Sequence, residues 1–390
     1  RLIQGDRNVY ICNECIEACF TLIQKDKEKS SANIKREIPT PAYVKDRLDE
    51  YIIGQERAKR VLAVAVHNHY KRLASEVTDD GVELEKSNVL LVGPTGSGKT
   101  LLVKILAEIL DVPFAITDAT TFTEAGYVGE DVENVLLRLL RDADFDVDRA
   151  QQGIVYIDEV DKIARKDQSA SITRDVSGEG VQQSLLKMFE QSIINVPPQG
   201  GRKHPEQKYI QMDTKDILFI CGGTFSGIEE IIGKRIGKKA IGFGAKMDQA
   251  ANKSTGEILS EIKMHDLIEY GMIREFIGRL HVLTTLMPHS QDDLIRIMLE
   301  PKNAIVKQYQ KIFDMENAVL EFPKNALEEI GKMALERKTG ARALRSIFEG
   351  FMLDAMFDLP TEGKGSTYVV TPEVVAGEAS LMPKKLRKSA

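Results

Sequence analysis

The sequence of 390 residues contains no tryptophan, has only four cysteines and lacks any apolar run long enough to cross a membrane. A membrane-spanning helix needs about 20 predominantly apolar residues. Four cysteines in so long a chain do not make a disulfide framework, so we expect a reducing compartment. No charged-then-apolar secretion signal opens the chain. These absences predict a cytoplasmic protein that does not enter the membrane.

The sequence has only a small excess of negative over positive charge. Lys and Arg total 53 and Asp and Glu total 59, so the net charge is −6. Proteins that coat nucleic acid or anionic membranes carry a broad basic surface instead. We therefore expect neither a membrane nor nucleic acid as a partner. With 43% hydrophobic residues the chain can build a large core, and its length suits two or three domains.

The chain changes character three times. Residues 1–25 hold three of the four cysteines, and residues 26–41 are charged and small and end in proline, which is typical of a flexible linker. Residues 42–288 alternate short apolar strands with helices, whereas residues 289–390 are mostly helical. The first residue is Arg1 rather than Met, so we expect the natural N-terminus to lie further upstream.

Short apolar runs bounded by helical patterns define the fold class. The runs that predict strands lie at residues 89–92, 154–157 and 217–220, with a helix predicted at 100–110. Buried strands separated by helices indicate a parallel sheet covered on both faces. Ser290, with Asp293 three residues later, resembles a helix cap at the start of the last part. We predict an α/β domain followed by a smaller, mostly helical α+β domain.

A phosphate-binding pattern, G-x-x-x-x-G-K-[ST], lies between the first predicted strand and the predicted helix: Gly93-Pro94-Thr95-Gly96-Ser97-Gly98-Lys99-Thr100, followed by Leu101. Backbone N–H groups of such a loop surround phosphate oxygens, and the helix adds the positive end of its dipole. Lys99 is expected to reach the β- and γ-phosphates, and the Thr100 hydroxyl to ligate Mg²⁺. The pattern predicts binding of ATP or ADP with Mg²⁺; the alternative is a plain glycine-rich turn.

The second predicted strand ends in two carboxylates, Asp158 and Glu159. Asp158 is placed to hold Mg²⁺ through its water shell. A carboxylate beside that position can orient and deprotonate a water, so Glu159 suits a hydrolase as the general base. The alternative interpretation is a surface pair that caps the following helix.

Further short motifs are spread over the chain: Tyr51-Ile52-Ile53-Gly54-Gln55, Gly126-Tyr127-Val128-Gly129, Arg202-Lys203-His204, Ile241-Gly242-Phe243, Glu275-Phe276-Ile277-Gly278-Arg279-Leu280 and Thr339-Gly340-Ala341-Arg342. Together with the phosphate loop, they resemble the ClpX family of AAA+ protein unfoldases, over nearly the whole chain. The relative HslU is not expected to have the 241–243 tripeptide or the cysteine-bearing start.

The resemblance implies roles for residues around the nucleotide. Arg279 would be an arginine finger that reaches the γ-phosphate held by the neighbouring subunit; the alternative is a structural Arg paired with a carboxylate. Arg342 would be the sensor-2 arginine, and Ile52 and Ile53 would line the adenine pocket. Thr224 is our candidate for the sensor-1 residue. Where the family pattern has Pro, Arg274 stands in this chain, which could alter the loop near the finger.

The resemblance also implies a substrate path. Tyr127 and Val128 would grip the translocating chain in a pore loop, since an aromatic ring between glycines offers contact area on a loop that can swing. Residues 169–180 would form a second pore loop, and Arg202-Lys203-His204 a basic collar for tags. Ile241-Gly242-Phe243 would dock on the ClpP peptidase. Taken alone, Tyr127 fits an ordinary turn with a half-buried Tyr better than a pore loop.

Cys12 and Cys15 form one C-x-x-C pair, whereas the family has two such pairs in an N-terminal zinc-binding domain. A closed structural zinc site needs four ligands. We expect Zn²⁺ in the full-length N-terminal domain, with this chain keeping half of the site, and Cys19 is a third thiol that could simply pack. The alternative is that these thiols lie on a short helix without metal.

The resemblance implies an ATPase that acts on proteins. Six identical subunits would form a ring, hydrolyse ATP, unfold tagged proteins brought directly or by adaptors, and thread them into ClpP; the ring could also act as a chaperone without ClpP. Two other classes stay open, a nucleic-acid motor and a non-enzymatic nucleotide switch. The acidic balance counts against the first, and Asp158 and Glu159 with Arg279 argue for hydrolysis against the second.

Overall fold

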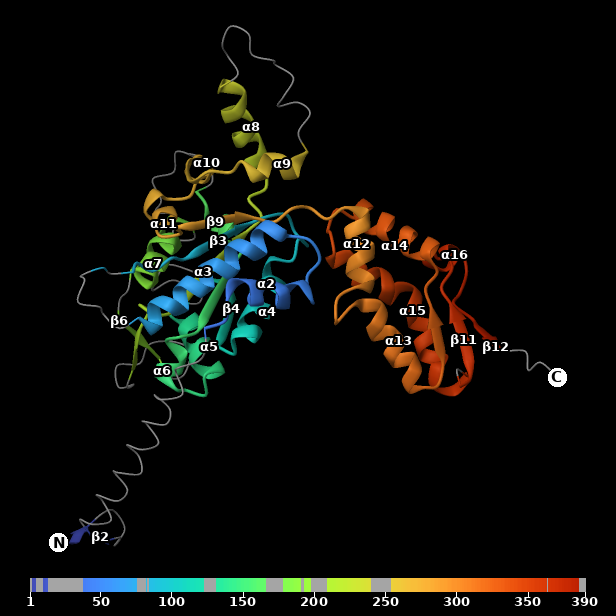
Figure 1. Cartoon of the computed structure of the whole chain (residues 1–390), viewed down its shortest axis with the longest axis horizontal. Helices are drawn as coiled ribbons and strands as arrows, with labels where there is room; N and C mark the ends of the chain where they lie inside the picture. The colour runs from blue at the N-terminus through green and yellow to red at the C-terminus, as the bar shows by residue number, and fades with distance from the viewer. Residues whose placement is uncertain are drawn as a thin grey trace.

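The computed structural model describes residues 2–4, 10–12, 38–75, 82, 84–122, 131–165, 178–190, 193–197, 209–239, 254–362 and 364–385. Figure 1 shows an N-terminal α/β unit and a smaller C-terminal unit, joined by the segment between β9 and α12. The buried apolar residues form separate clusters on either side of this segment, one set ending at Leu286 and the other beginning at Leu294.

The N-terminal unit is built on a parallel sheet of five strands in the order β4-β5-β8-β3-β9. Their bounds are β3 (Val89–Val92), β4 (Phe114–Asp118), β5 (Ile154–Asp158), β8 (Leu218–Gly223) and β9 (Val282–Thr285). The predicted parallel sheet is confirmed. Strands β3, β5 and β8 are the three apolar runs, whereas β4 and β9, at the two edges, were not predicted.

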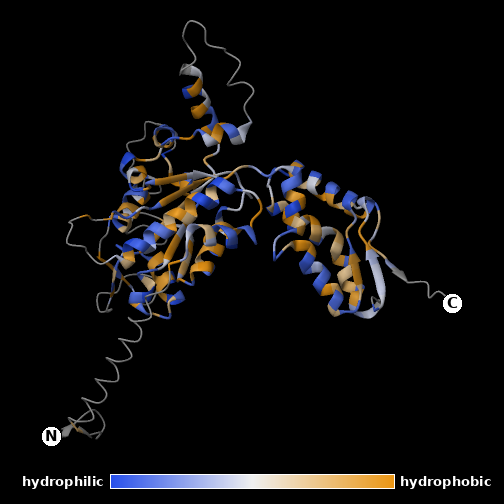
Figure 2. Cartoon of the chain, viewed as in Figure 1, coloured by the Kyte–Doolittle hydropathy of each residue, from blue (hydrophilic) through white to orange (hydrophobic). Residues whose placement is uncertain are grey.

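Successive residues of the central strands pack into different cores, as the alternation of a strand requires. Leu90 and Val92 join the core under α5 and α7, whereas Val89 and Leu91 join the core under α2, α3 and α4. Both faces of the sheet are therefore covered, and in Figure 2 the strands are largely hydrophobic. This burial explains why β3, β5 and β8 are continuous apolar runs.

In the N-terminal unit, helices pack against both faces of the sheet, and α8 extends away from it (Figure 1). They are α2 (Pro41–Asp49), α3 (Glu56–Ala74), α4 (Lys99–Leu110), α5 (Asn134–Asp142), α6 (Val147–Ala150), α7 (Glu179–Phe189), α8 (Ile228–Lys239), α9 (Thr255–Ser260), α10 (Met264–Tyr270) and α11 (Arg274–Gly278). Short 3-10 turns are η2 (Ala119–Thr121) and η3 (Val160–Ile163), and β6 (Ile193–Val196) pairs with β7 (Ile210–Asp213) as an antiparallel ribbon. Helix α4 confirms the helix predicted after the phosphate loop.

The C-terminal unit is mostly helical, as predicted. It comprises α12 (Gln291–Leu299), α13 (Ile305–Met315), β10 (Val319–Glu321), α14 (Lys324–Glu336), α15 (Arg342–Glu362), β11 (Ser366–Val369), α16 (Pro372–Val375) and β12 (Pro383–Lys385). The predicted cap of α12 is present: the Asp293 N–H donates to Ser290 Oγ at 3.1 Å, and the Ser290 N–H donates to the Asp293 carboxylate at 3.0 Å. The core of the C-terminal unit contains the aromatic residues Phe313, Phe348 and Tyr368.

At the N-terminus, β1 (Leu2–Gln4) pairs antiparallel with β2 (Tyr10–Cys12). Cys12 therefore ends a strand, and the alternative of a thiol on a short helix is wrong for this residue. Across the part of the chain that the structure describes, no helix is both long and apolar enough to cross a membrane.

His69 provides a pH test of this fold. It is 4% exposed on α3, and its pKa is lowered to about 3 by burial and then by the charges of Arg72 and Lys86. Because the pKa in the unfolded chain is near 6.5, the unfolded chain binds a proton between about pH 6.5 and 3 that the native state refuses, so native stability falls as the pH drops.

We predict that His69→Leu removes this contribution. The urea midpoint of the wild type, relative to that of His69→Leu, should fall steadily from pH 6.5 to pH 4, measured by far-UV circular dichroism. A difference that stays constant over this range would show that His69 does not titrate in this way.

Candidate functional site

The phosphate loop leaves the carboxyl end of β3 and enters α4 at Lys99. Gly96 and Gly98 have φ angles of +76° and +95°, in the left-handed region that glycine adopts without steric cost. This backbone turns the loop around the first turn of α4, where free N–H groups and the helix dipole favour an anion. Local sequence alone produces this anion site.

Lys99 is held at the centre of the loop. Its side chain is 9% exposed, and its Nζ donates to the carbonyl oxygens of Gly93 at 2.7 Å and Pro94 at 3.1 Å. Burial lowers the pKa of Lys99, and the Asp158 carboxylate opposes that shift. Nζ therefore lies inside the site, with neutral carbonyl partners that a phosphate oxygen can replace.

Thr100 and Asp158 meet at the carboxyl edge of the sheet. The Thr100 hydroxyl donates to Asp158 Oδ2 at 2.8 Å, although the residues are 58 positions apart in the sequence. A hydroxyl and a carboxylate oxygen are the ligands that Mg²⁺ prefers. The pair fits the predicted magnesium site, and both residues line the same pocket as Lys99.

Glu159 follows Asp158 in a left-handed conformation, with φ +56°, and its N–H donates to Asp158 Oδ1 at 2.9 Å. The sharp turn ends β5 and starts η3, and Glu159 lines the pocket beside Lys99 and Thr224. A non-glycine residue in this region carries backbone strain, which is typical of functional positions. The geometry places a carboxylate in the pocket that Lys99 also lines.

Asp161 is a residue near the pocket that sequence reasoning missed. Its carboxylate is buried and accepts the Thr224 N–H at 3.0 Å and the Thr224 hydroxyl at 3.3 Å. The contact ties Thr224, just after β8, to the turn that carries Glu159. The signal in the sequence was a third acidic residue two positions after Glu159.

The C-terminal unit closes the pocket. Ala341 and Arg342, at the start of α15, line it together with the phosphate loop. The contact is close, because a Cβ on Gly96 would lie 2.2 Å from the Thr339 carbonyl oxygen. The structure therefore brings the predicted sensor-2 residue to the nucleotide pocket from the second unit. The pocket is lined by Thr95, Gly96, Gly98, Lys99, Thr100, Leu101, Asp158, Glu159, Thr224, Ala341 and Arg342.

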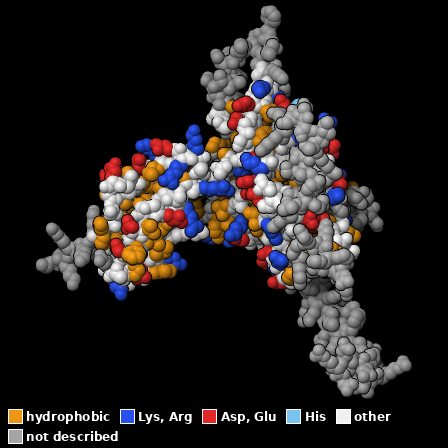
Figure 3. Space-filling model, turned by 180° about the vertical axis from the view of Figure 1, so that it is seen from behind, with side chains coloured by type: hydrophobic (Ala, Val, Ile, Leu, Met, Phe, Trp, Pro, Cys, Tyr) orange, Lys and Arg blue, Asp and Glu red, His pale blue; other side chains and the backbone are white. Residues whose placement is uncertain are grey.

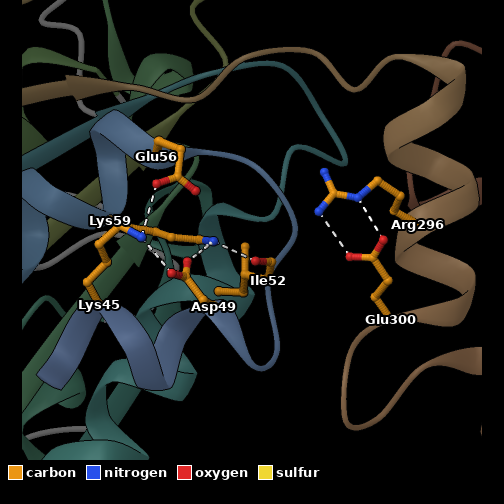
Figure 4. Close-up of polar contacts among 7 residues, drawn as sticks. All are labelled: Lys45, Asp49, Ile52, Glu56, Lys59, Arg296 and Glu300. Carbon is orange, nitrogen blue, oxygen red and sulfur yellow. Dashed lines mark hydrogen bonds and ion pairs between the residues drawn. The ribbon is translucent and has the colours of Figure 1, made fainter. Parts of the chain in front are cut away.

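Ile52 and Ile53 are buried and do not line the pocket that contains Lys99. Each is 6% exposed. The Ile52 carbonyl accepts a hydrogen bond from Lys59 Nζ at 2.6 Å, and Lys59, 1% exposed, also pairs with Asp49 at 2.6 Å. Figure 4 shows this network, with Glu56 and Lys45 at its edge. The neighbouring residue Tyr51 lines an apolar groove that shares Leu101 and Ala341 with the nucleotide pocket.

Arg279 lies away from the pocket of its own chain. It follows α11, its side chain is 48% exposed, and its Nη2 donates to Glu190 Oε1 at 3.1 Å. Its backbone carbonyl accepts from Asn88 Nδ2 at 3.1 Å. The Glu190 pair is the structural role that sequence reasoning held as the alternative, and about half of the Arg279 side chain is exposed to solvent.

Several predicted residues lie outside the described part of the chain: Cys15, Tyr127, Val128, Arg202, Lys203, His204, Ile241, Gly242 and Phe243. Cys12 is the proposed zinc ligand that is described. Within the described ranges, no cluster of three or more His, Cys, Asp or Glu could hold a metal. A structural zinc site needs four ligands, and Cys12 supplies one of them.

The Gly96 contact makes a testable prediction. Gly96→Ala should weaken ATP binding by about tenfold or more, because its Cβ would collide with the Thr339 carbonyl as well as strain the backbone. Gly98→Ala is the matched control, since Gly98 also has a positive φ but has no atom within 4 Å of its added Cβ. Titration with a fluorescent ATP analogue measures both; equal losses would show that backbone strain alone matters.

Three family models match this chain. The AAA domain (Cdc48 subfamily) matches residues 84–283, just over half of the chain, and the C-terminal, D2-small domain, of ClpB protein matches residues 290–370. The chain therefore belongs to the AAA domain family, and its site is that of an AAA+ ATPase. The ClpX C4-type zinc finger matches residues 1–25. With the three matches in this order, it is a ClpX-like AAA+ protein.

Proposed function

We propose that this chain is an ATP-dependent protein unfoldase and translocase that works as a homohexameric ring in the cytoplasm. The observation that carries the proposal is one pocket holding Lys99, the Thr100–Asp158 pair and Glu159, closed by Arg342, in a chain whose N-terminus matches a ClpX-type zinc finger. The corresponding division is residues 1–25, 26–41, 42–288 and 289–390, for zinc-binding remnant, linker, large ATPase domain and small domain.

ATP binding exchanges the partners of Lys99. The γ-phosphate replaces the Gly93 and Pro94 carbonyls at Nζ, while the N–H groups of the loop surround the β-phosphate. Thr100 and Asp158 would hold Mg²⁺, which when bound neutralises negative charge on the phosphates. The Thr100 hydroxyl already faces Asp158, so this corner of the site is arranged before the nucleotide enters.

Hydrolysis needs a water in line with the γ-phosphate. Glu159 accepts a proton from that water as its oxygen attacks phosphorus, and ADP leaves with the bridging oxygen. Thr224, which is hydrogen-bonded to Asp161, would orient the water. Arg279 of a neighbouring subunit would add positive charge in the transition state, so that hydrolysis depends on assembly.

The C-terminal unit responds to the nucleotide. Arg342 and the Thr339–Gly340 turn contact the pocket directly, so occupancy of the phosphate loop and the position of this unit are coupled. In a ring, that movement would be passed to the adjacent subunit. Substrate grip by Tyr127 and Val128, tag attraction by Arg202-Lys203-His204 and ClpP docking by Ile241-Gly242-Phe243 are parts of the same proposal, supported by the family resemblance.

Tyr127→Ala tests the grip. We expect this variant to hydrolyse ATP at a rate near that of the wild type and to degrade a folded, tagged reporter with ClpP about tenfold more slowly, because an aromatic contact surface is lost. Degradation is followed by reporter fluorescence and ATP turnover by phosphate release. Tyr127→Phe is the matched control. Undiminished degradation by Tyr127→Ala would refute the grip.

A nucleic-acid motor has less support. On the face shown in Figure 3, Lys and Arg side chains are interspersed with Asp and Glu. A motor that tracks a phosphate backbone uses a basic stripe. ATP turnover stimulated by DNA would favour that class, and negligible turnover by the assembled ring would favour a nucleotide switch.

A further inference from the structure

We propose that Gln55 is a positioning residue that couples the phosphate loop to the segment joining the two units. The segment, residues 286–289, runs from β9 to the capping residue Ser290 of α12 and is therefore the start of the C-terminal unit. Gln55 lies 232 positions away in the sequence, at the beginning of α3. The inference rests on the proposed ATPase cycle and adds a second link between the loop and the C-terminal unit, beside the direct contact of Gly96 with Thr339.

The Gln55 side chain contacts the joining segment and the phosphate loop at the same time. Its Nε2 donates to the Met287 carbonyl at 2.9 Å and its Oε1 accepts the Met287 N–H at 2.8 Å. The same Nε2 lies 3.4 Å from the carbonyl oxygen of Ser97 in the phosphate loop. The Gln55 amide therefore pairs with both the N–H and the carbonyl of Met287 and also contacts the carbonyl of Ser97 in the loop. This pattern needs a donor and an acceptor on one side chain.

The local backbone gives an independent argument. Gln55 occupies the N-cap position of α3, where Ser, Thr, Asp or Asn would cap the helix, yet its side chain makes no capping hydrogen bond. It also adopts φ +58°, a left-handed conformation that costs free energy for a non-glycine residue. The polar group that could have capped α3 is instead directed to Met287, so the position serves a contact outside its own helix.

The joining segment is bound to the phosphate loop at neighbouring points as well. The Leu286 N–H donates to the Val92 carbonyl at 2.8 Å, and a Cβ on Gly93 would lie 2.9 Å from Leu286 Cβ. These contacts fix the near end of the segment to the sheet. Gln55 acts one residue further on, at Met287, where the chain departs toward α12. A shift of the Ser97 carbonyl on phosphate binding would therefore reach α12 through Gln55.

Gln55→Glu tests the coupling with little change of size. The carboxylate still accepts the Met287 N–H, but an oxygen now faces the carbonyls of Met287 and Ser97 in place of the donor. Gln291→Glu is the matched control, because Gln291 Nε2 also donates to a backbone carbonyl, that of Glu328 at 3.0 Å, but within the C-terminal unit. Both substitutions are made in the full chain.

Three quantities are measured on each protein: the Kd of a fluorescent ATP analogue, kcat for ATP hydrolysis, and energy transfer between fluorophores carried by unnatural amino acids at Lys104 and Lys324. Both side chains are exposed, on α4 and α14. For Gln55→Glu we expect Kd to change less than about threefold, kcat to fall about tenfold, and the change of energy transfer on adding ATPγS to fall to about half or less, since the contact of Gly96 with Thr339 is left in place. Gln291→Glu should match the wild type in all three.

A Gln55→Glu protein with the wild-type response to ATPγS would overturn the inference, and so would a wild type whose units do not respond to nucleotide. A purely structural role would instead lower ATP affinity and the urea midpoint together, without the split between Kd and kcat. The proposed function is tested separately, by measuring unfolding of a folded reporter by the wild type. If the wild type did not unfold the reporter, the energy-transfer result would still stand.

Discussion

Glu159→Gln is expected to bind ATP with near wild-type affinity and to hydrolyse it at least about 100-fold more slowly. A positioned general base contributes about 10²–10⁴-fold to a rate, and the amide cannot take the proton of the attacking water. Binding should persist because Lys99, Thr100 and Asp158 hold the phosphates and the metal without Glu159. The left-handed turn at Glu159 is compatible with Gln, since the Glu159 side chain makes no helix-capping hydrogen bond.

The measurement pairs ATP-analogue titration with phosphate release. Glu269→Gln is the matched control, since Glu269 is exposed on α10 and lies outside the pocket. Rapid turnover by Glu159→Gln would remove Glu159 from the role of general base. Loss of binding together with hydrolysis would show that the residue supports the loop rather than the chemistry.

Arg279→Ala is expected to lose about 10³-fold in ATP turnover while its own site still binds ATP. An arginine finger is worth about 10³–10⁵ in kcat. The affinity should be preserved because Arg279 does not line the pocket of its own chain. In the structure its guanidinium pairs with Glu190 at 3.1 Å, an exposed pair that should contribute about 1 kcal/mol or less to stability.

Glu190→Gln separates the two roles of Arg279. If the pair with Glu190 were the reason for Arg279, removing either partner would have the same effect on turnover. We expect Glu190→Gln to hydrolyse ATP like the wild type, because the finger remains available to the neighbouring subunit. Mixed rings give a second check: Arg279→Ala subunits should lower the turnover of neighbouring wild-type sites, whereas a role within one chain would leave those sites unchanged.

The strands that could be predicted are the ones buried on both faces. Strands β3, β5 and β8 lie inside the sheet and read as continuous apolar runs. The edge strands are less apolar: β4 contains an exposed Ile116 and ends in Asp118, and β9 ends in two threonines. An edge strand has fewer neighbours, so its sequence carries a weaker pattern.

In the candidate site, too, some residues could be predicted from the sequence and others could not. The phosphate loop and Asp158 with Glu159 are local motifs, so residue types at fixed spacing were enough to find them. The contacts of Asp161 with Thr224, of Gln55 with Met287 and of Gly96 with Thr339 join distant parts of the chain. Such pairs are set by how the units pack, and a single sequence contains no signal for that packing. The adenine-pocket role of Ile52 and Ile53 stays a prediction; both side chains are buried.

The most direct test of the central claim is loss of fluorescence from a stable folded reporter carrying a C-terminal degradation tag, with no peptidase present. We predict loss with ATP and none with ATPγS or with Glu159→Gln, because mechanical unfolding requires hydrolysis at Glu159. A reporter that keeps its fluorescence while the wild type turns over ATP and binds the tag would contradict the proposed unfoldase function.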